Sequence, residues 1–192
     1  MNNQLPVGSG PGQAVYRTAF LAAAVLGAVV SPGVARAQVE ADPADVESID
    51  GIVAALYDVI SGEAGEARDW GRFESLFVSD GRLMPTWSQE SRAQRLSWGP
   101  AEYGEAVTES LERSGFFETE LHREVQQFGQ VAHVFSTYES RNSPEDETPF
   151  ARGINSIQLF HDGTRWWIVT VFWASERPDL PVPAEYLPGD GG

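Results

Sequence analysis

The chain has 192 residues, a length within reach of a single domain, and a net charge of −15. It contains no cysteine, and all 13 of its basic side chains are arginine. This composition excludes disulfides, thiolate nucleophiles, cysteine-based metal sites, Schiff-base lysines and a P-loop lysine. A chain this acidic is also a poor partner for nucleic acid or an anionic membrane surface.

Residues 1–37 have the pattern of a secretory signal peptide. The 13-residue apolar run Thr18–Val30 is too short for a comfortable membrane span, and Arg17 supplies positive charge ahead of it. Ala35–Ala37 has the small-x-small pattern of a cleavage site. Cleavage after Ala37 leaves 11 basic residues against 28 acidic ones, a net charge of −17. We expect a periplasmic or secreted protein with no membrane contact after cleavage; the alternative is a retained membrane anchor.

Residues 38–44 are expected to be a flexible lead-in to a domain that spans residues 45–175. From Asp45 onward, apolar residues recur at helical spacing, which predicts a helix capped by Asp45 and ended at Ser61-Gly62. The Gly- and Glu-rich stretch 62–67 is expected to be a loop. The domain therefore begins with a helix.

A second, shorter helix is expected after Asp69, which is a suitable N-cap. A short strand over residues 82–87 and an exposed polar loop over 88–97 follow. Pro100 is well placed in the first turn of a third helix that runs to about Arg113, because proline is tolerated there.

Four long strands in two hairpins are predicted between Phe116 and Ala174, where β-branched and aromatic residues are dense. The first hairpin pairs residues 116–128 with 131–141 through Gly129-Gln130. The second turns at Asp162-Gly163, a strong signal for a two-residue turn. The last part of the chain, residues 176–192, is rich in proline and glycine and is expected to form an extended tail.

The expected register of the second hairpin places His161 opposite Thr164 and Arg152 opposite Trp173. Cross-strand partners share a face of the sheet. Ser156 and Gln158 then lie on that same face. Both faces of this hairpin are largely apolar, so we expect helices to cover one and a partner or further chain to cover the other.

The expected register of the first hairpin places Phe128 opposite Val131. Ser136 and Tyr138 then share one face, whereas Glu120 and Glu124 lie on the other. A slip of one residue would exchange these sets relative to each other.

The element order predicts an α+β fold with helices on one side of a bent sheet. Residues 129–139 and 152–159, with Trp166, Trp167 and Trp173, resemble a bacterial branch of the nuclear transport factor 2-like superfamily, which is related in fold to ketosteroid isomerases and polyketide cyclases. The resemblance implies a cystatin-like cone, in which a curved antiparallel sheet is closed by three N-terminal helices. It also implies a small-ligand opening in the cone and a homodimer through the outer face of the sheet.

Polar side chains among buried apolar ones are costly unless they are paired or orient a ligand. This predicts ligand contact, with Arg152 beside Trp173 holding a carboxylate and Tyr138 donating a hydrogen bond. The alternative is structural: Tyr138 packs its ring, and Arg152 pairs with a nearby acid. The predicted ligand-binding residues are Ser136, Tyr138, Arg152, Ser156, Gln158 and Trp173.

The expected function is an exported small-molecule-binding domain without assigned catalysis, because the register leaves no acid beside Tyr138. One alternative is a cofactor-free lyase or isomerase that acts next to a carbonyl, with Tyr138 as proton donor. The other is a dimeric protein-interaction module whose own aromatic side chains fill the cone.

No metal and no cofactor are expected. His122 and His133 share a face, but about 13 Å of strand separates them at roughly 3.3 Å per residue, too far to share one ion. The sequence contains no P-loop, dinucleotide fingerprint, GxSxG or HExxH motif.

Overall fold

A computed structural model describes residues 40–89 and 92–189 of the chain. The expected signal peptide, residues 1–37, and its cleavage site lie outside the described residues. All described residues belong to one structural unit, Ala37–Gly192. None of the helices in this described part is both long and apolar enough to cross a membrane.

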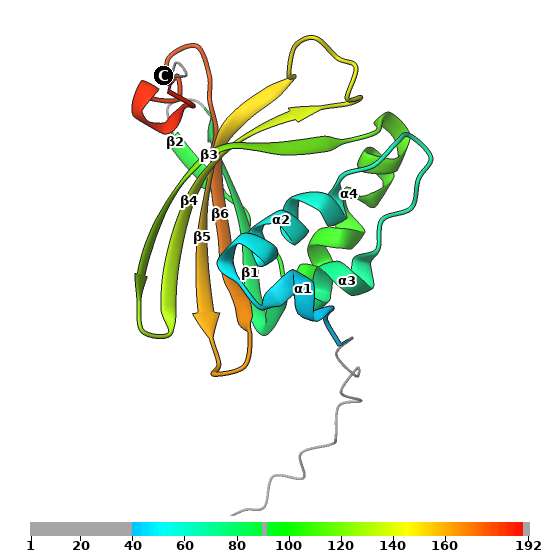
Figure 1. Ribbon diagram of the computed structural model, residues 1–192. Coiled ribbons are helices and arrows are strands. Elements are labelled where there is room, and N and C mark those ends of the chain that lie inside the picture. The colour runs from blue at the N-terminus through cyan, green and yellow to red at the C-terminus, as the bar shows by residue number, and fades with distance from the viewer. Residues whose placement is uncertain (1–39, 90–91, 190–192) are drawn as a thin grey trace, which may run out of the picture. The chain divides into compact units, whose positions relative to one another are not determined.

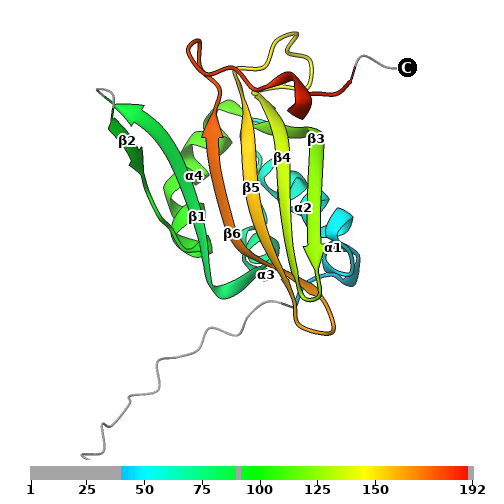
Figure 2. The same cartoon turned by 90° about the vertical axis from the view of Figure 1, so that its left-hand side faces the viewer.

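Six strands form one curved sheet, and the helices pack on one of its faces (Figure 1). We call the face toward the helices the concave face and the other, which is turned toward the viewer in Figure 2, the convex face. The strand order is β2-β1-β6-β5-β4-β3. The strands are β1 (Phe77–Gln89), β2 (Arg92–Arg95), β3 (Phe117–Phe128), β4 (Val131–Arg141), β5 (Ala151–His161) and β6 (Trp166–Ser175).

One pair of strands departs from the antiparallel pattern that the resemblance implied. β1 runs parallel to β6, whereas the other neighbouring strands pair antiparallel. Hairpin partners must run in opposite directions, but β1 and β6 are separated by most of the domain and are free of that constraint. β1 is also longer than predicted and carries a bulge between Phe77 and Arg82. The expected loop 88–97 contains β2, which forms a hairpin with the end of β1.

The helices are α1 (Pro43–Val46), α2 (Ile49–Ile60), α3 (Trp70–Ser75) and α4 (Pro100–Ser114), with a 3-10 turn η1 (Ala184–Tyr186) near the C-terminus. Asp69 caps α3 and Pro100 begins α4, as predicted. The prediction of a single first helix is wrong, because two helices, α1 and α2, take its place. Ser48 takes an extended backbone conformation and accepts a hydrogen bond from the Gly51 amide, which starts α2. α1 occupies part of the expected lead-in, 38–44.

The hydrophobic core lies between the helices and the concave face. α2 contributes one continuous apolar stripe, as its helical spacing predicted. Partners come from α3 and from the middle of the sheet, where the strands are long enough to bury side chains on this face. The most deeply buried core residues are Ile52, Val53, Phe73, Leu76, Phe77, Val134, Ile157 and Ile168.

The predicted register of the second hairpin is wrong. Its loop has four residues, so His161 pairs with Trp166. The Asp162 carboxylate accepts hydrogen bonds from the backbone amides of Thr164 and Arg165, and this side-chain contact closes the longer loop. Val169 has no partner on β5, and this second irregularity exchanges the two faces of β6 beyond it.

The register of the first hairpin is right from its turn as far as His122 and wrong beyond it. Phe128 pairs with Val131 as predicted, but Leu121 has no partner on β4. Beyond this bulge, Glu120 pairs with Tyr138 rather than lying on the opposite face. The bulge therefore brings the acidic end of β3 to the concave face.

The segment after β6, residues 176–187, crosses one end of the convex face (Figure 2). The Thr137 hydroxyl donates to the Tyr186 carbonyl over 2.6 Å, and the Phe135 and Tyr186 rings meet edge to face at 5.1 Å. The chain thus covers part of the face for which the sequence predicted a partner or further chain.

Gly153, in the middle of β5, is expected to tolerate no side chain. A methyl group there would lie 2.3 Å from the Ala174 carbonyl oxygen and 2.7 Å from the Tyr138 hydroxyl. We predict that Gly153→Ala lowers the free energy of unfolding by about 1–3 kcal/mol, as overpacking of a tight site does. Urea unfolding would measure this. Gly189→Ala, where a methyl group meets open space, is the control; equal stability of both variants would contradict the close contact.

Candidate functional site

A cavity of about 230 Å³ lies between the concave face and helices α2 to α4. Its lining is largely apolar, and much of it is aromatic. One carboxyl group, Glu118, and two phenol groups, Tyr103 and Tyr138, also line it. The remaining lining residues are Leu56, Ile60, Phe73, Leu83, Phe116, Ser140, Phe150, Ala151, Asn155, Val171, Trp173 and Ser175.

Glu118 lies deep in the protein, and it keeps some exposed surface because it lines the cavity. Its carboxyl oxygens accept hydrogen bonds from the Asn155 amide and the Ser140 hydroxyl, each over 3.2 Å. Burial is the larger influence and raises the pKa of Glu118 to about 7, although both hydrogen bonds lower it. The group can therefore gain or lose a proton near neutral pH.

Tyr138 reaches the cavity from β4. Its ring passes over Gly153, and its hydroxyl lies 3.0 Å from the Ser175 hydroxyl. Burial, with a smaller contribution from the charge of Glu118, raises the pKa of Tyr138 to about 12, although the hydrogen bond with Ser175 lowers it. The phenol is therefore neutral at physiological pH and available as a hydrogen-bond donor.

Tyr103 reaches the cavity from α4 and was not among the predicted site residues. Its ring stacks on Phe73 at 5.6 Å and meets Trp173 edge to face at 6.3 Å. Burial raises the pKa of Tyr103, and the charges of Glu118 and Tyr138, which line the same cavity, add to that rise. Within residues 40–89 and 92–189, the Tyr103 hydroxyl makes no hydrogen bond.

A chain of hydrogen bonds continues behind the cavity. Asn155 donates to both Glu118 and the Tyr57 hydroxyl, which lies 2.7 Å from the Ser136 hydroxyl. Ser136 in turn donates to Glu120, which is paired with the Arg123 guanidinium. Each of these buried polar groups is satisfied, so the chain stabilises one arrangement of the cavity wall.

The predicted site residues do not share one face. Tyr138 and Trp173 line the cavity. Ser136 lies on the same concave face, but its hydroxyl is already hydrogen-bonded to Tyr57 and Glu120. The bulge in β6 separates Trp173 from the other three predicted residues. Ser136 and Tyr138 are separated from them by the pairing of β4 with β5, in which they lie opposite Asn155 and Gly153.

Arg152, Ser156 and Gln158 lie on the convex face. Arg152 sits between Glu139 and Glu176, with nitrogen–oxygen distances of 3.9 and 3.7 Å, and not beside Trp173. The Ser156 hydroxyl is 2.9 Å from the His133 ring, and Gln158 is exposed. In the described part of the chain, no three His, Asp or Glu side chains are grouped so that they could hold a metal ion.

No protein-family model and no functionally curated protein matches this chain. Solved structures do. One is a protein of unknown function with a cystatin-like fold from Nostoc punctiforme, 18% identical, with a TM-score of 0.52. The match covers 69% of this chain and 91% of that one.

Two further structures are similar. A nuclear transport factor 2-like protein with a cystatin-like fold from Novosphingobium aromaticivorans is 16% identical, with a TM-score of 0.51, and the match covers 67% of this chain and 79% of that one. A nuclear transport factor 2-like protein of unknown function from Pseudomonas putida KT2440 is 12% identical, with a TM-score of 0.52. The match covers 74% of this chain and 95% of that one. The chain thus has the nuclear transport factor 2-like, cystatin-like fold that its sequence predicted. Identities this low establish the fold alone.

The raised pKa of Glu118 predicts a pH-dependent stability. Between the ordinary value of 4.5 and the folded value of about 7, the folded protein holds a proton that the unfolded chain releases, so the free energy of unfolding falls as pH rises through that window. Glu118→Gln removes this dependence. We expect its stability relative to the unmutated protein to rise by about 2–3 kcal/mol from pH 5 to pH 8. Urea unfolding at both pH values would measure it, and a difference that does not change with pH would contradict the assigned environment.

Proposed function

We propose that this protein binds a small, largely apolar organic molecule in the concave cavity, with a carbonyl or similar acceptor of the molecule facing Tyr103. The observation that carries the proposal is a phenol hydroxyl without a hydrogen-bond partner among the described residues, inside an apolar cavity and close to Glu118. Tyr103 is half-buried, so its hydroxyl reaches the open volume of the cavity. A ligand that fills this volume must supply an acceptor, because a hydroxyl left buried and unpaired costs about 1–3 kcal/mol.

The size and walls of the cavity support a compact ligand with a ring. A dry cavity of about 150 Å³ admits benzene, so about 230 Å³ has room for one or two fused rings. The half-buried rings of Tyr103 and Trp173 offer surfaces for aromatic contacts with a ligand. The open volume also supports ligand binding over an interaction module whose cone is filled by its own aromatic side chains.

Catalysis next to a carbonyl is the second candidate, and one observation favours it. Glu118 supplies an acid in the same cavity as Tyr138, where the sequence-based register had left none. A carboxyl group with a pKa of about 7 can take a proton from carbon and return it, and a neutral phenol can donate to the oxygen on which charge develops. The reaction class is a cofactor-free isomerisation or elimination.

We further infer an exported protein that forms a homodimer. Export is supported by the apolar run and cleavage pattern of residues 1–37. Dimerisation is supported by large apolar side chains left exposed on the convex face, among them Phe160 at 40% and Val131 at 58% exposure.

Native mass spectrometry of the mature protein, purified from its own host, tests the binding proposal. We expect a retained small molecule, released on denaturation. Ala151→Phe, which places a ring in the cavity, should abolish retention. The matched control is Ala174→Phe, which places the same ring on the convex face of the neighbouring strand. Retention that survives Ala151→Phe would place the molecule elsewhere.

Exchange of the α-protons of 1-indanone in deuterated buffer, followed by NMR, tests the catalytic candidate. We expect the protein to accelerate exchange and Glu118→Gln to reduce the acceleration by about 10²–10⁴-fold, the usual contribution of a general base. Glu124→Gln is the control, since Glu124 lies on the same strand but on the other face. Exchange no faster than in buffer would argue against catalysis while leaving binding intact.

A further inference from the structure

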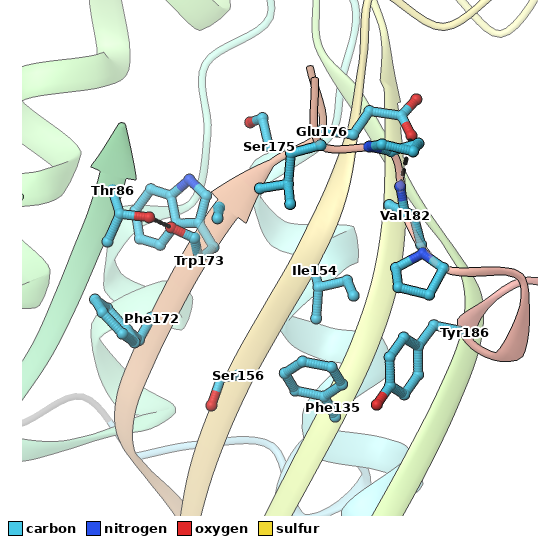
Figure 3. Close-up of a pocket in the computed structure, with 14 residues that line it drawn as sticks. Thr86, Phe135, Ile154, Ser156, Phe172, Trp173, Ser175, Glu176, Val182 and Tyr186 are labelled. Atoms are coloured by element: carbon cyan, nitrogen blue, oxygen red, sulfur yellow. Dashed lines mark hydrogen bonds between the residues drawn. The ribbon is translucent and has the colours of Figure 1, made fainter. Parts of the chain in front are cut away.

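A second recess lies on the convex face, where residues 176–187 cross the sheet (Figure 3). Its volume is about 360 Å³. We infer that this recess, which we call the outer hollow, is a binding site for a small, neutral, apolar molecule. The inference is independent of the function proposed for the concave cavity.

The floor of the outer hollow is apolar and partly aromatic. Phe135, Ile154 and Phe172 project into it from three neighbouring strands (Figure 3). These residues share the convex face because Ile154 pairs with Ala174 and Ser156 with Phe172 beyond the bulge in β6. The bulge that moved Trp173 to the concave face therefore also created this floor.

The segment after β6 forms a fixed wall. At its start, the Glu176 amide donates to the Arg152 carbonyl over 2.7 Å, and the Glu176 carboxylate accepts from the Val182 amide over 3.2 Å. At its end, Tyr186 is held by Thr137 and Phe135. Between these anchors, Pro181 and Pro183 have a fixed φ and no amide hydrogen, so the wall is stiff and presents few donors.

Four of the polar side chains that line the outer hollow are already hydrogen-bonded or ion-paired, and this bears on the chemistry of its ligand. Thr86 donates to the Trp173 carbonyl over 2.8 Å, the Ser156 hydroxyl is bonded to His133, and the Ser175 hydroxyl is bonded to Tyr138. Glu176, the acidic residue of the lining, faces Arg152 and Val182. A charged or strongly polar ligand would lose its hydration without replacement, whereas a neutral apolar one would not.

The shape of the outer hollow favours a small molecule over a second copy of the chain. Its volume lies within the range of about 300–1,000 Å³ that is usual for small-ligand sites. One side is walled by the chain's own segment, so a sheet face from another copy would meet the rim and leave the recess unfilled. Phe172 and Leu180, exposed by 41% and 48%, mark the opening.

Titration with N-phenyl-1-naphthylamine, a neutral apolar probe that fluoresces on binding, tests the inference. We expect saturable fluorescence with the unmutated protein, a loss of affinity of at least about tenfold in Ala174→Phe, which fills the outer hollow, and no loss in Ala151→Phe, which fills the concave cavity. No saturable binding, or a loss confined to Ala151→Phe, would overturn the inference.

Urea unfolding of each variant checks that a loss of probe binding comes from the filled recess and not from an unfolded protein. Tyr186→Ala, which removes a ring from the wall without filling the recess, should also weaken binding. Sedimentation velocity detects the competing occupant: a dimer that Ala174→Phe dissociates and that excludes the probe would assign the outer hollow to a second copy of the chain and overturn the inference.

Discussion

Leu121 has no partner on β4, so the register of the first hairpin shifts by one residue between His122 and Glu120. Side chains alternate between the faces of a strand, and a one-residue shift therefore exchanges the faces of everything beyond it. Without the shift, Glu118 and Glu120 would lie on the face opposite Tyr138, where the sequence-based register placed Glu120. With the shift, both carboxyl groups lie under the helices. The chemistry available to the cavity depends on this one residue.

The two carboxyl groups stand two residues apart on one strand and face different surroundings. Glu120 is paired with the Arg123 guanidinium and accepts a hydrogen bond from the buried Ser136 hydroxyl. Glu118 receives hydrogen bonds from neutral groups alone, so burial prevails and its pKa rises to about 7. Asn155 joins the two environments by bonding to Glu118 and to Tyr57, which contacts Ser136. One carboxyl group is thereby held in an ion pair, and the other is left able to exchange a proton near neutral pH.

The sequence predicted the elements better than their pairing. Helical spacing, the Asp69 cap and Pro100 are local signals, and the structure agrees with them. The turn at Gly129-Gln130 was also right, because its length follows from its own residues. The predicted length of the loop at Asp162 was wrong. The dipeptide Asp162-Gly163 favours a two-residue turn, but the Asp162 side chain closes a loop of four residues. Neither Leu121 nor Val169 is a residue type that marks a bulge. Glu118 was missed because it lies beyond the bulge in β3. Tyr103 was missed because its place in the cavity depends on how α4 packs against the sheet.

The bulges in β3 and β6 together produce two recesses of opposite chemistry in one sheet. On the concave face, a phenol without a partner among the described residues and a carboxyl group near neutrality lie among aromatic rings, so a molecule gains from offering a hydrogen-bond acceptor. On the convex face, the hydroxyl groups of Thr86, Ser156 and Ser175 are already hydrogen-bonded. A molecule with an entirely apolar surface should therefore bind there better than a polar one. Trp173 and Ser175 border both recesses. Because the concave cavity rewards a hydrogen-bond acceptor and the outer hollow penalises one, the two recesses should select different ligands rather than compete for one.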